Sequence, residues 1–323
     1  MTILITGCAG FIGAHLAKKL LGNNHHITGV DNLNDYYSVE LKKARLKYLV
    51  GKNKNFVFQK ADIGDKKKLD EIFSKNSFDL VIHLAAQAGV RYSLVNPYVY
   101  EKTNIEGTLN ILEAVRHSQP KPKLIFASSS SVYGNSKQIP FKENDPCNKP
   151  ASFYGATKKA GEMMVRAYYR LYGIKSCCLR FFTAYGPWGR PDMAYYSFTK
   201  KISSGEPIDL FQNNTQRDFT YIDDIVEAID RLVQKEFDFE IINLGNSRPE
   251  RLDKFVGILE KCIGKKAKVK IKELPPGDIK ATYADISKTK KLLFWHPKIN
   301  IEEGLKNFVN WYKTFSLLSF RTG

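Results

Sequence analysis

Tyr154 and Lys158 are four residues apart, near the start of a stretch (152–172) that we expect to be helical. This spacing puts both side chains on the same side of a helix. An ammonium group beside a phenol, together with a cationic nicotinamide, favours the phenolate and lowers the pKa of the tyrosine. Such a phenolate is a general base that removes a hydroxyl proton while a hydride leaves the same carbon. The spacing by itself is common, and an exposed surface pair has the same pattern.

A run of four serines, Ser128 to Ser131, stands at the carboxyl end of an expected buried strand (123–129). Ligands of open α/β sheets bind outside the carboxyl ends of the strands. A hydroxyl there can form a hydrogen bond with the reacting oxygen of a substrate. The serine run therefore makes a reactive tyrosine–lysine pair a better interpretation than a surface pair.

Gly7, Gly10 and Gly13 directly follow an expected strand, Thr2 to Thr6, and open a helix. Glycine lets the backbone turn tightly and approach a pyrophosphate, and the helix amino end presents free N–H groups to the phosphates. Asp31, at the end of the second strand, is placed to accept hydrogen bonds from a ribose 2′-hydroxyl. The pattern predicts NAD rather than NADP, although a tight turn without a ligand has the same glycines.

Strands and helices alternate through the first half of the chain, which is typical of a parallel sheet covered by helices on both faces. We predict an α/β fold with a doubly wound, Rossmann-like sheet and a smaller C-terminal α/β substrate-binding lobe. The expected NAD-binding domain covers 1–175, with returning segments at about 222–244. The expected lobe covers about 176–221 and 245–323. A strand is expected at 176–182, and long helices at 97–117 and 152–172.

Composition limits the function classes. The 323 residues include an odd number of cysteines, five, without a Cys-x-x-Cys pair, so we expect no disulfide framework and no metal site. No apolar run is long enough for membrane insertion and no signal peptide is visible, which fits the cytoplasm. The formal net charge of +17 is consistent with a lysine-rich surface or an anionic substrate. We expect no nucleic acid partner, since no basic tail or RNA-binding aromatic pattern is present.

The glycine turn, the strand-end serine and the tyrosine–lysine pair, in this order, resemble the extended short-chain dehydrogenases/reductases. The resemblance implies that Tyr154 is the base, that Lys158 binds the nicotinamide ribose, and that Ser129 is the hydroxyl partner. It also implies NAD contacts along the first four strands. The candidate cofactor residues are Gly7, Gly10, Phe11, Ile12, Gly13, Asp31, Asn32, Asp62, Ile63, Leu84, Ala85, Ala86, Tyr154 and Lys158. For Asp62, which could meet the adenine amino group, a role at a helix start is equally open.

Five segments (31–37, 85–93, 180–183, 185–193 and 217–221) are together similar to UDP-glucuronate 4-epimerases. This resemblance implies oxidation of the sugar at C4 by tightly held NAD and return of the hydride to the other face. Guanidinium groups pair bidentately with phosphates and carboxylates, so Arg217 suits the diphosphate and Arg190 or Arg91 the uronate carboxylate. By resemblance, Thr183 and Arg190 contact that carboxylate. The candidate substrate residues are Arg91, Ser129, Ser130, Thr183, Arg190, Arg217 and Asp278.

Several alternatives stay open. The substrate could be a neutral or N-acetylated UDP-hexose. Related dehydratases and decarboxylases carry acidic residues where Ser130 and Ser131 stand, which disfavours elimination and decarboxylation. A dehydrogenase with exchangeable cofactor, and a non-enzymatic NAD-binding or RNA-binding protein, also fit parts of the pattern. The resemblance further implies a homodimer formed through the helices at 97–117 and 152–172.

Overall fold

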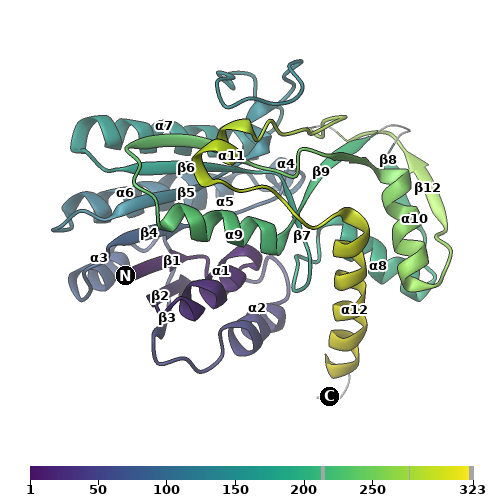
Figure 1. The fold of residues 1–323 in the computed structure, drawn as a ribbon, viewed down its shortest axis with the longest axis horizontal. Helices are drawn as coiled ribbons and strands as arrows, with labels where there is room; N and C mark the ends of the chain where they lie inside the picture. The colour runs from purple at the N-terminus through teal and green to yellow at the C-terminus, as the bar shows by residue number, and fades with distance from the viewer. Residues whose placement is uncertain (212–214, 276, 320–323) are drawn as a thin grey trace.

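The computed structural model describes residues 1–211, 215–275 and 277–319. Its centre is a seven-stranded parallel sheet in the order β10-β6-β5-β4-β1-β2-β3 (Figure 1). The strands are β1 (Thr2–Thr6), β2 (His26–Asp31), β3 (Phe56–Lys60), β4 (Leu80–His83), β5 (Lys123–Ser129), β6 (Ser176–Phe181) and β10 (Phe239–Leu244). The direction of winding reverses between β1 and β4, and a crevice forms at such a point outside the carboxyl ends of the strands. The predicted doubly wound sheet is confirmed.

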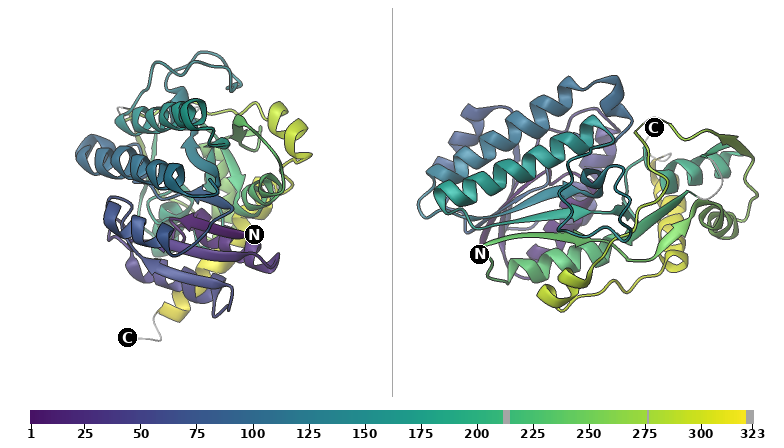
Figure 2. Two further views of the ribbon diagram at one scale, coloured as in Figure 1. Left: turned by 90° about the vertical axis from the view of Figure 1, so that its left-hand side faces the viewer. Right: turned by 90° about the horizontal axis from the view of Figure 1, so that it is seen from above.

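Helices cover both faces of this sheet (Figure 2). On one face, α1 (Phe11–Gly22) packs against α9 (Ile222–Val233). On the other, α6 (Gly107–His117) packs against α3 (Lys66–Ser74) and α7 (Phe153–Tyr172). Because both faces are covered, central strands are apolar throughout, and all four residues of β4 are buried. Short elements join these layers: α2 (Val39–Arg45), a π-helical turn η1 (Leu46–Val50), α4 (Tyr92–Val95), α5 (Tyr98–Tyr100), a second π-helical turn η2 (Glu101–Glu106) and a 3₁₀ turn η3 (Ser130–Tyr133).

Helix α7, which carries Tyr154 and Lys158, has clear start and stop signals. The Ser152 side chain caps its first turn by accepting a hydrogen bond from the Gly155 amide. Gly173 ends it in the left-handed conformation, with φ of 68°. The helix expected at 152–172 is therefore confirmed. The helix expected at 97–117 is present as α5, η2 and α6, because a π-helical turn interrupts it.

A smaller lobe stands at the carboxyl ends of the strands (Figure 1). It contains a three-stranded sheet, β11-β9-β7, and a two-stranded sheet, β12-β8. Its elements are β7 (Thr183–Tyr185), α8 (Ala194–Ser204), β8 (Ile208–Phe211), β9 (Gln216–Tyr221), β11 (Pro249–Arg251), α10 (Leu252–Ile263), β12 (Val269–Lys272) and α12 (Ile301–Ser319). Within the described part of the chain, no helix is both long and apolar enough to cross a bilayer.

Two details correct the expected domain boundaries. Strand β6 pairs with β5 and β10 in the large sheet, so the boundary placed after residue 175 falls one strand too early. Helix α11 (Ser287–Leu293), expected in the lobe, packs against β10 and α9 of the large layer. Pairing partners of a short buried strand are set by tertiary contacts, which its local pattern does not specify.

Candidate active site

A cavity opens at the carboxyl ends of the central strands and runs from the glycine turn to the smaller lobe. Its wall brings together predicted cofactor residues from the first four strands: Gly7, Gly10, Phe11, Ile12, Gly13, Asp31, Asn32, Ile63, Leu84, Ala85 and Ala86. The same wall contains Ser129, Ser130, Tyr154, Lys158, Thr183, Arg190, Arg217 and Asp278. Asp62 and Arg91 are not among its lining residues.

The glycine turn is a backbone cradle that side chains would fill. A Cβ atom on Gly13 would lie 2.1 Å from the Gly7 carbonyl oxygen, and one on Gly7 would lie 2.8 Å from the Ala85 amide nitrogen. Gly7 also has φ of +73°, which side-chain-bearing residues rarely adopt. Helix α1 begins here without a side-chain cap, so its amino end is open to an anion. This geometry fits the diphosphate of NAD.

Asp31 organises the same turn from the end of β2. Its Oδ2 atom accepts a hydrogen bond from the Ala9 amide at 3.0 Å, and its Oδ1 atom accepts one from the Leu33 amide at 2.9 Å. Burial raises the pKa of its carboxyl group. Asp31 lines the cavity, as the ribose contact requires.

Asp62 accepts two hydrogen bonds close to its own loop. Its Oδ1 atom accepts a hydrogen bond from the Gly64 amide at 2.7 Å, and its Oδ2 atom accepts one from the Asn32 side-chain amide at 2.7 Å. These contacts organise the loop before α3, and the adenine contact and the role at a helix start both stay predictions. The cap of α3 itself is Asp65.

The expected catalytic residues converge from β5 and α7. The Lys158 ammonium is buried and donates to the Ala127 carbonyl at 2.8 Å, and burial lowers its pKa to about 7. Burial raises the pKa of Tyr154, while a hydrogen bond with Ser129 and the positive charge of Arg190 oppose the rise. The predicted lowering of the Tyr154 pKa requires a cationic nicotinamide beside Lys158, and it stays a prediction for the NAD-bound site, because burial alone outweighs the Ser129 hydrogen bond and the Arg190 charge.

At the lobe end of the cavity, Arg217 is a partly buried cation that donates to two backbone carbonyls, those of Gln216 at 2.9 Å and Lys280 at 3.3 Å. Burial lowers its pKa, against the attraction of Asp278. A bound anion would offset this desolvation, so Arg217 is suited to a diphosphate. Thr183 begins β7 in the same wall.

The other two arginines are already paired. Arg190 donates through Nε and Nη2 to the two oxygens of Asp192, at 3.0 and 2.5 Å. A guanidinium has five N–H donors, so the Nη1 edge of Arg190 keeps donors for a second carboxylate. Arg91 lies at the surface, 57% exposed, and donates to Asp278 at 2.8 Å. The structure therefore does not bring Arg91 to the cavity as a carboxylate partner.

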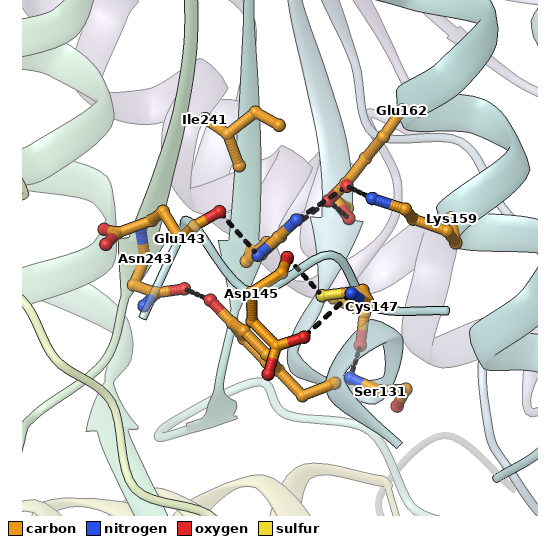
Figure 3. Close-up of polar contacts among 12 residues, drawn as sticks. Ser131, Glu143, Asp145, Cys147, Lys159, Glu162, Ile241 and Asn243 are labelled. Atoms are coloured by element: carbon orange, nitrogen blue, oxygen red, sulfur yellow. Dashed lines mark hydrogen bonds and ion pairs between the residues drawn. The ribbon is translucent and has the colours of Figure 1, made fainter. Parts of the chain in front are cut away.

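The sequence analysis did not predict a buried polar network that links α7 to β5 and β6 (Figure 3). Glu162, on the inner side of α7, accepts hydrogen bonds from the Ser128 hydroxyl at 2.6 Å and from Nε and Nη2 of Arg180 at 2.8 and 2.9 Å. Two sequence signals could have found it. Glu162 is four residues after Lys158, on the same helix side, and Arg180 interrupts an apolar strand.

A family model described as GDP-mannose 4,6 dehydratase matches residues 4–308. The chain belongs to this NAD-dependent epimerase/dehydratase family. It is 48% identical over 312 residues to a UDP-glucuronate 4-epimerase of Thermodesulfobacterium geofontis, with 96% of this chain and 95% of that protein covered. The family resemblance predicted from the sequence is thereby confirmed.

Two solved structures of the family are similar throughout. UDP-glucuronic acid 4-epimerase of Bacillus cereus, in complex with UDP-glucuronic acid and NAD, has a TM-score of 0.91 and 36% identity and covers 98% of this chain and 100% of its own. UDP-glucose 4-epimerase of Thermotoga maritima, with UDP-glucose, has a TM-score of 0.87 and 33% identity, with the same coverage. Both sugar classes are thus represented among close structural relatives.

Proposed function

We propose that this protein interconverts UDP-glucuronate and UDP-galacturonate through a 4-keto intermediate, with NAD held in the cavity. The proposal rests on one observation. The same cavity is lined by residues suited to hydride transfer and by cations suited to an anionic sugar nucleotide. Ser129, Tyr154 and Lys158 lie at the cofactor side, and the cations Arg190 and Arg217 lie at the lobe side. A substrate with a carboxylate and a diphosphate matches the two cations.

NAD would be held by the glycine turn, Asp31 and Lys158, and when bound it would supply a reversible hydride acceptor for C4 of the sugar. Tyr154 takes the proton of the C4 hydroxyl and gives it back to the keto oxygen. The Ser129 hydroxyl holds that oxygen in place by a hydrogen bond. Lys158 binds the nicotinamide ribose, and Asp31 the ribose nearest the adenine, which selects NAD over NADP.

The lobe side orients the sugar nucleotide. Arg217 pairs with the diphosphate, while Thr183 and the free edge of Arg190 hold the uronate carboxylate. The 4-keto intermediate is a β-keto acid, which loses CO₂ readily, so a fixed carboxylate geometry protects it. Ser130 and Ser131 provide no acidic group beside the reacting carbons, which argues against the dehydratase and decarboxylase reactions.

A second candidate, a 4-epimerase for a neutral or N-acetylated UDP-hexose, is favoured by one observation. The carboxylate of Asp192 neutralises Arg190, and the ion pair as a whole carries no net charge toward the sugar. A neutral hydroxymethyl group could accept hydrogen bonds from the same guanidinium edge.

The deciding experiment incubates the purified protein with UDP-glucuronate, without added NAD, and follows the anomeric region by NMR. UDP-galacturonate should appear, which also requires retained NAD. If UDP-galacturonate appears only after NAD is added, the proposed reaction is supported but tight retention of NAD is refuted. Conversion of UDP-glucose or UDP-N-acetylglucosamine, with no uronate product, would favour the second candidate.

We further propose a cytoplasmic homodimer formed through α6 and α7. Large apolar side chains are exposed on these helices, namely Leu109, Met163 and Leu171. All five cysteines are free thiols, as in proteins of a reducing compartment. Sedimentation analysis of the wild type and of Met163→Glu should give a dimer and a monomer, respectively.

A further inference from the structure

Arg45 is a fully buried arginine whose guanidinium donates hydrogen bonds to four neutral acceptors. It is the last residue of α2 and is followed by the π-helical turn η1. Its Nη1 atom donates to the Ala9 carbonyl at 3.1 Å and to the Tyr37 hydroxyl at 2.6 Å. Its Nε atom donates to the Trp188 carbonyl at 2.8 Å, and Nη2 to the Gly189 carbonyl at 3.0 Å. A buried guanidinium is costly, so these four contacts indicate a specific task.

The four acceptors come from both sides of the cavity. Ala9 lies between Gly7 and Gly10 in the cofactor turn, and its amide donates to Asp31. Trp188 and Gly189 directly precede Arg190 in the smaller lobe. One guanidinium therefore joins the turn that fits the NAD diphosphate to the loop that carries the sugar-facing arginine.

The loop before Arg190 needs this support. Trp188 has φ of 63°, a left-handed conformation that is unusual for a bulky residue and persists only when surrounding contacts hold it. Arg45 holds it by taking two successive carbonyls, and the Arg190 amide donates to the Tyr195 hydroxyl at 3.2 Å. The backbone of Gly189 packs directly against the same side chain, since a Cβ atom there would lie 2.0 Å from that hydroxyl. The direction in which Arg190 points thus depends on Arg45.

We propose that Arg45 is a positioning residue that couples cofactor binding to recognition of the sugar carboxylate. A diphosphate bound at the glycine turn fixes the Ala9 carbonyl and with it the Arg45 guanidinium. Fixing the guanidinium orders residues 188–190, so the second ligand loses less conformational entropy when it binds. Coupling between two binding sites is reciprocal, so the sugar nucleotide strengthens cofactor binding by the same factor. This inference rests on the proposed function, because it takes Arg190 as the carboxylate contact.

The test measures that factor directly. The full chain is first freed of retained NAD and then dialysed to equilibrium against NADH, with and without saturating UDP-glucuronate, and the bound NADH is quantified. NADH prevents the oxidation step, so only binding is observed. In the wild type, UDP-glucuronate should lower the Kd for NADH by about fivefold or more. Arg45→Lys keeps the charge but cannot reach all four acceptors. The Kd ratio, which is the Kd for NADH without UDP-glucuronate divided by the Kd with it, should therefore fall close to one in this variant.

Arg231→Lys is the matched control. Arg231 also donates to two successive carbonyls, those of Leu293 and Phe294, but it joins α9 to α11 away from the cavity. Its Kd ratio should equal that of the wild type. Tyr37→Phe is a milder second variant, which keeps the ring and removes one acceptor of Arg45. Its ratio should fall between those of the wild type and Arg45→Lys, and it keeps the test informative if Arg45→Lys does not fold.

A wild-type ratio in Arg45→Lys, or in Tyr37→Phe when the lysine variant does not fold, would overturn the coupling role. A Kd ratio of one in the wild type would also overturn the coupling role, provided that a direct measurement shows UDP-glucuronate to be bound. Failure of NADH-loaded wild type to bind UDP-glucuronate would instead refute the proposed substrate, and with it the inference.

Discussion

Glu162 and Arg180 form a doubly hydrogen-bonded ion pair inside the protein, with Nε–Oε1 and Nη2–Oε2 distances of 2.8 and 2.9 Å. Each side chain is only 1% exposed. Glu162 lies one helical turn after Lys158, and it also accepts a hydrogen bond from Ser128, the neighbour of Ser129. The pair therefore ties the helix that carries the tyrosine–lysine pair to the ends of β5 and β6.

Removing the charge of Glu162 should destabilise the fold strongly. Glu162→Gln leaves the Arg180 guanidinium buried without a counter-charge, and breaking a buried pair in this way costs about 3–5 kcal/mol. Urea denaturation should show this loss in the free energy of unfolding. Glu71→Gln, which breaks the exposed Lys68–Glu71 pair, should leave that free energy unchanged. Equal effects of the two changes would contradict the prediction.

The same pair should make the stability difference depend on pH. Burial pushes the pKa of Glu162 up, but the hydrogen bonds and charge of Arg180 hold it below its ordinary value of 4.5. A lowered carboxyl pKa contributes stability above the unfolded value, and that contribution is lost as the pH falls through the folded value. The difference in the free energy of unfolding between wild type and Glu162→Gln should thus be largest near neutral pH and decrease below pH 4.5. A difference in the free energy of unfolding that stays constant from pH 7 to pH 3 would contradict this prediction.

Tyr154→Phe should strongly lower the rate of UDP-glucuronate epimerisation and leave NADH binding nearly unchanged. Loss of a general base costs about 10²–10⁴-fold in rate, while the ring keeps its packing against Tyr100. The measurement is the kcat for UDP-glucuronate by NMR, together with the Kd for NADH, which should stay within twofold. Tyr169→Phe, farther along the same helix, should behave as wild type. An active Tyr154→Phe enzyme would exclude this tyrosine as the base.

Arg190→Met should separate uronate from neutral sugars. Hydrogen bonds to a charged partner contribute about 1.5–3 kcal/mol, which corresponds to a loss of roughly 10- to 150-fold in kcat/KM for UDP-glucuronate. Thr183→Val should lower it in the same direction, by less. Binding of UDP alone, measured by calorimetry, should be unchanged in both variants because Arg217 is intact. If uronate turnover survived both substitutions, the carboxylate contact would be wrongly assigned.

Two glycines of helix α1 should respond oppositely to alanine. In Gly13→Ala the new Cβ atom would lie 2.1 Å from the Gly7 carbonyl oxygen, so the cofactor turn must shift and NADH affinity should fall at least about tenfold. Gly22→Ala meets nothing within 4 Å and should keep the wild-type affinity while raising stability by up to about 1 kcal/mol. Dialysis against NADH and thermal denaturation check both. Tight NADH binding by Gly13→Ala would exclude the turn as the diphosphate site.

Much of the site could be predicted because its signals are local. Gly7, Gly10 and Gly13 are required by the backbone of one turn, and Tyr154 and Lys158 share a helix side through their spacing alone. The alternation of strands and helices likewise indicates the parallel sheet, since each element carries its own hydrophobic period. These features depend on neighbours a few residues away.

Tertiary structure decided the features that need distant partners. It paired β6 with β10, paired Arg91 with Asp278, and buried Tyr154, which raises the pKa of that tyrosine. It also brought Arg45 to the carbonyls of residues 188 and 189, more than 140 positions away along the chain. Burial and long-range hydrogen bonds depend on which segments meet in the folded chain. Local residue patterns do not contain that information, so these contacts emerge only when the layers pack together.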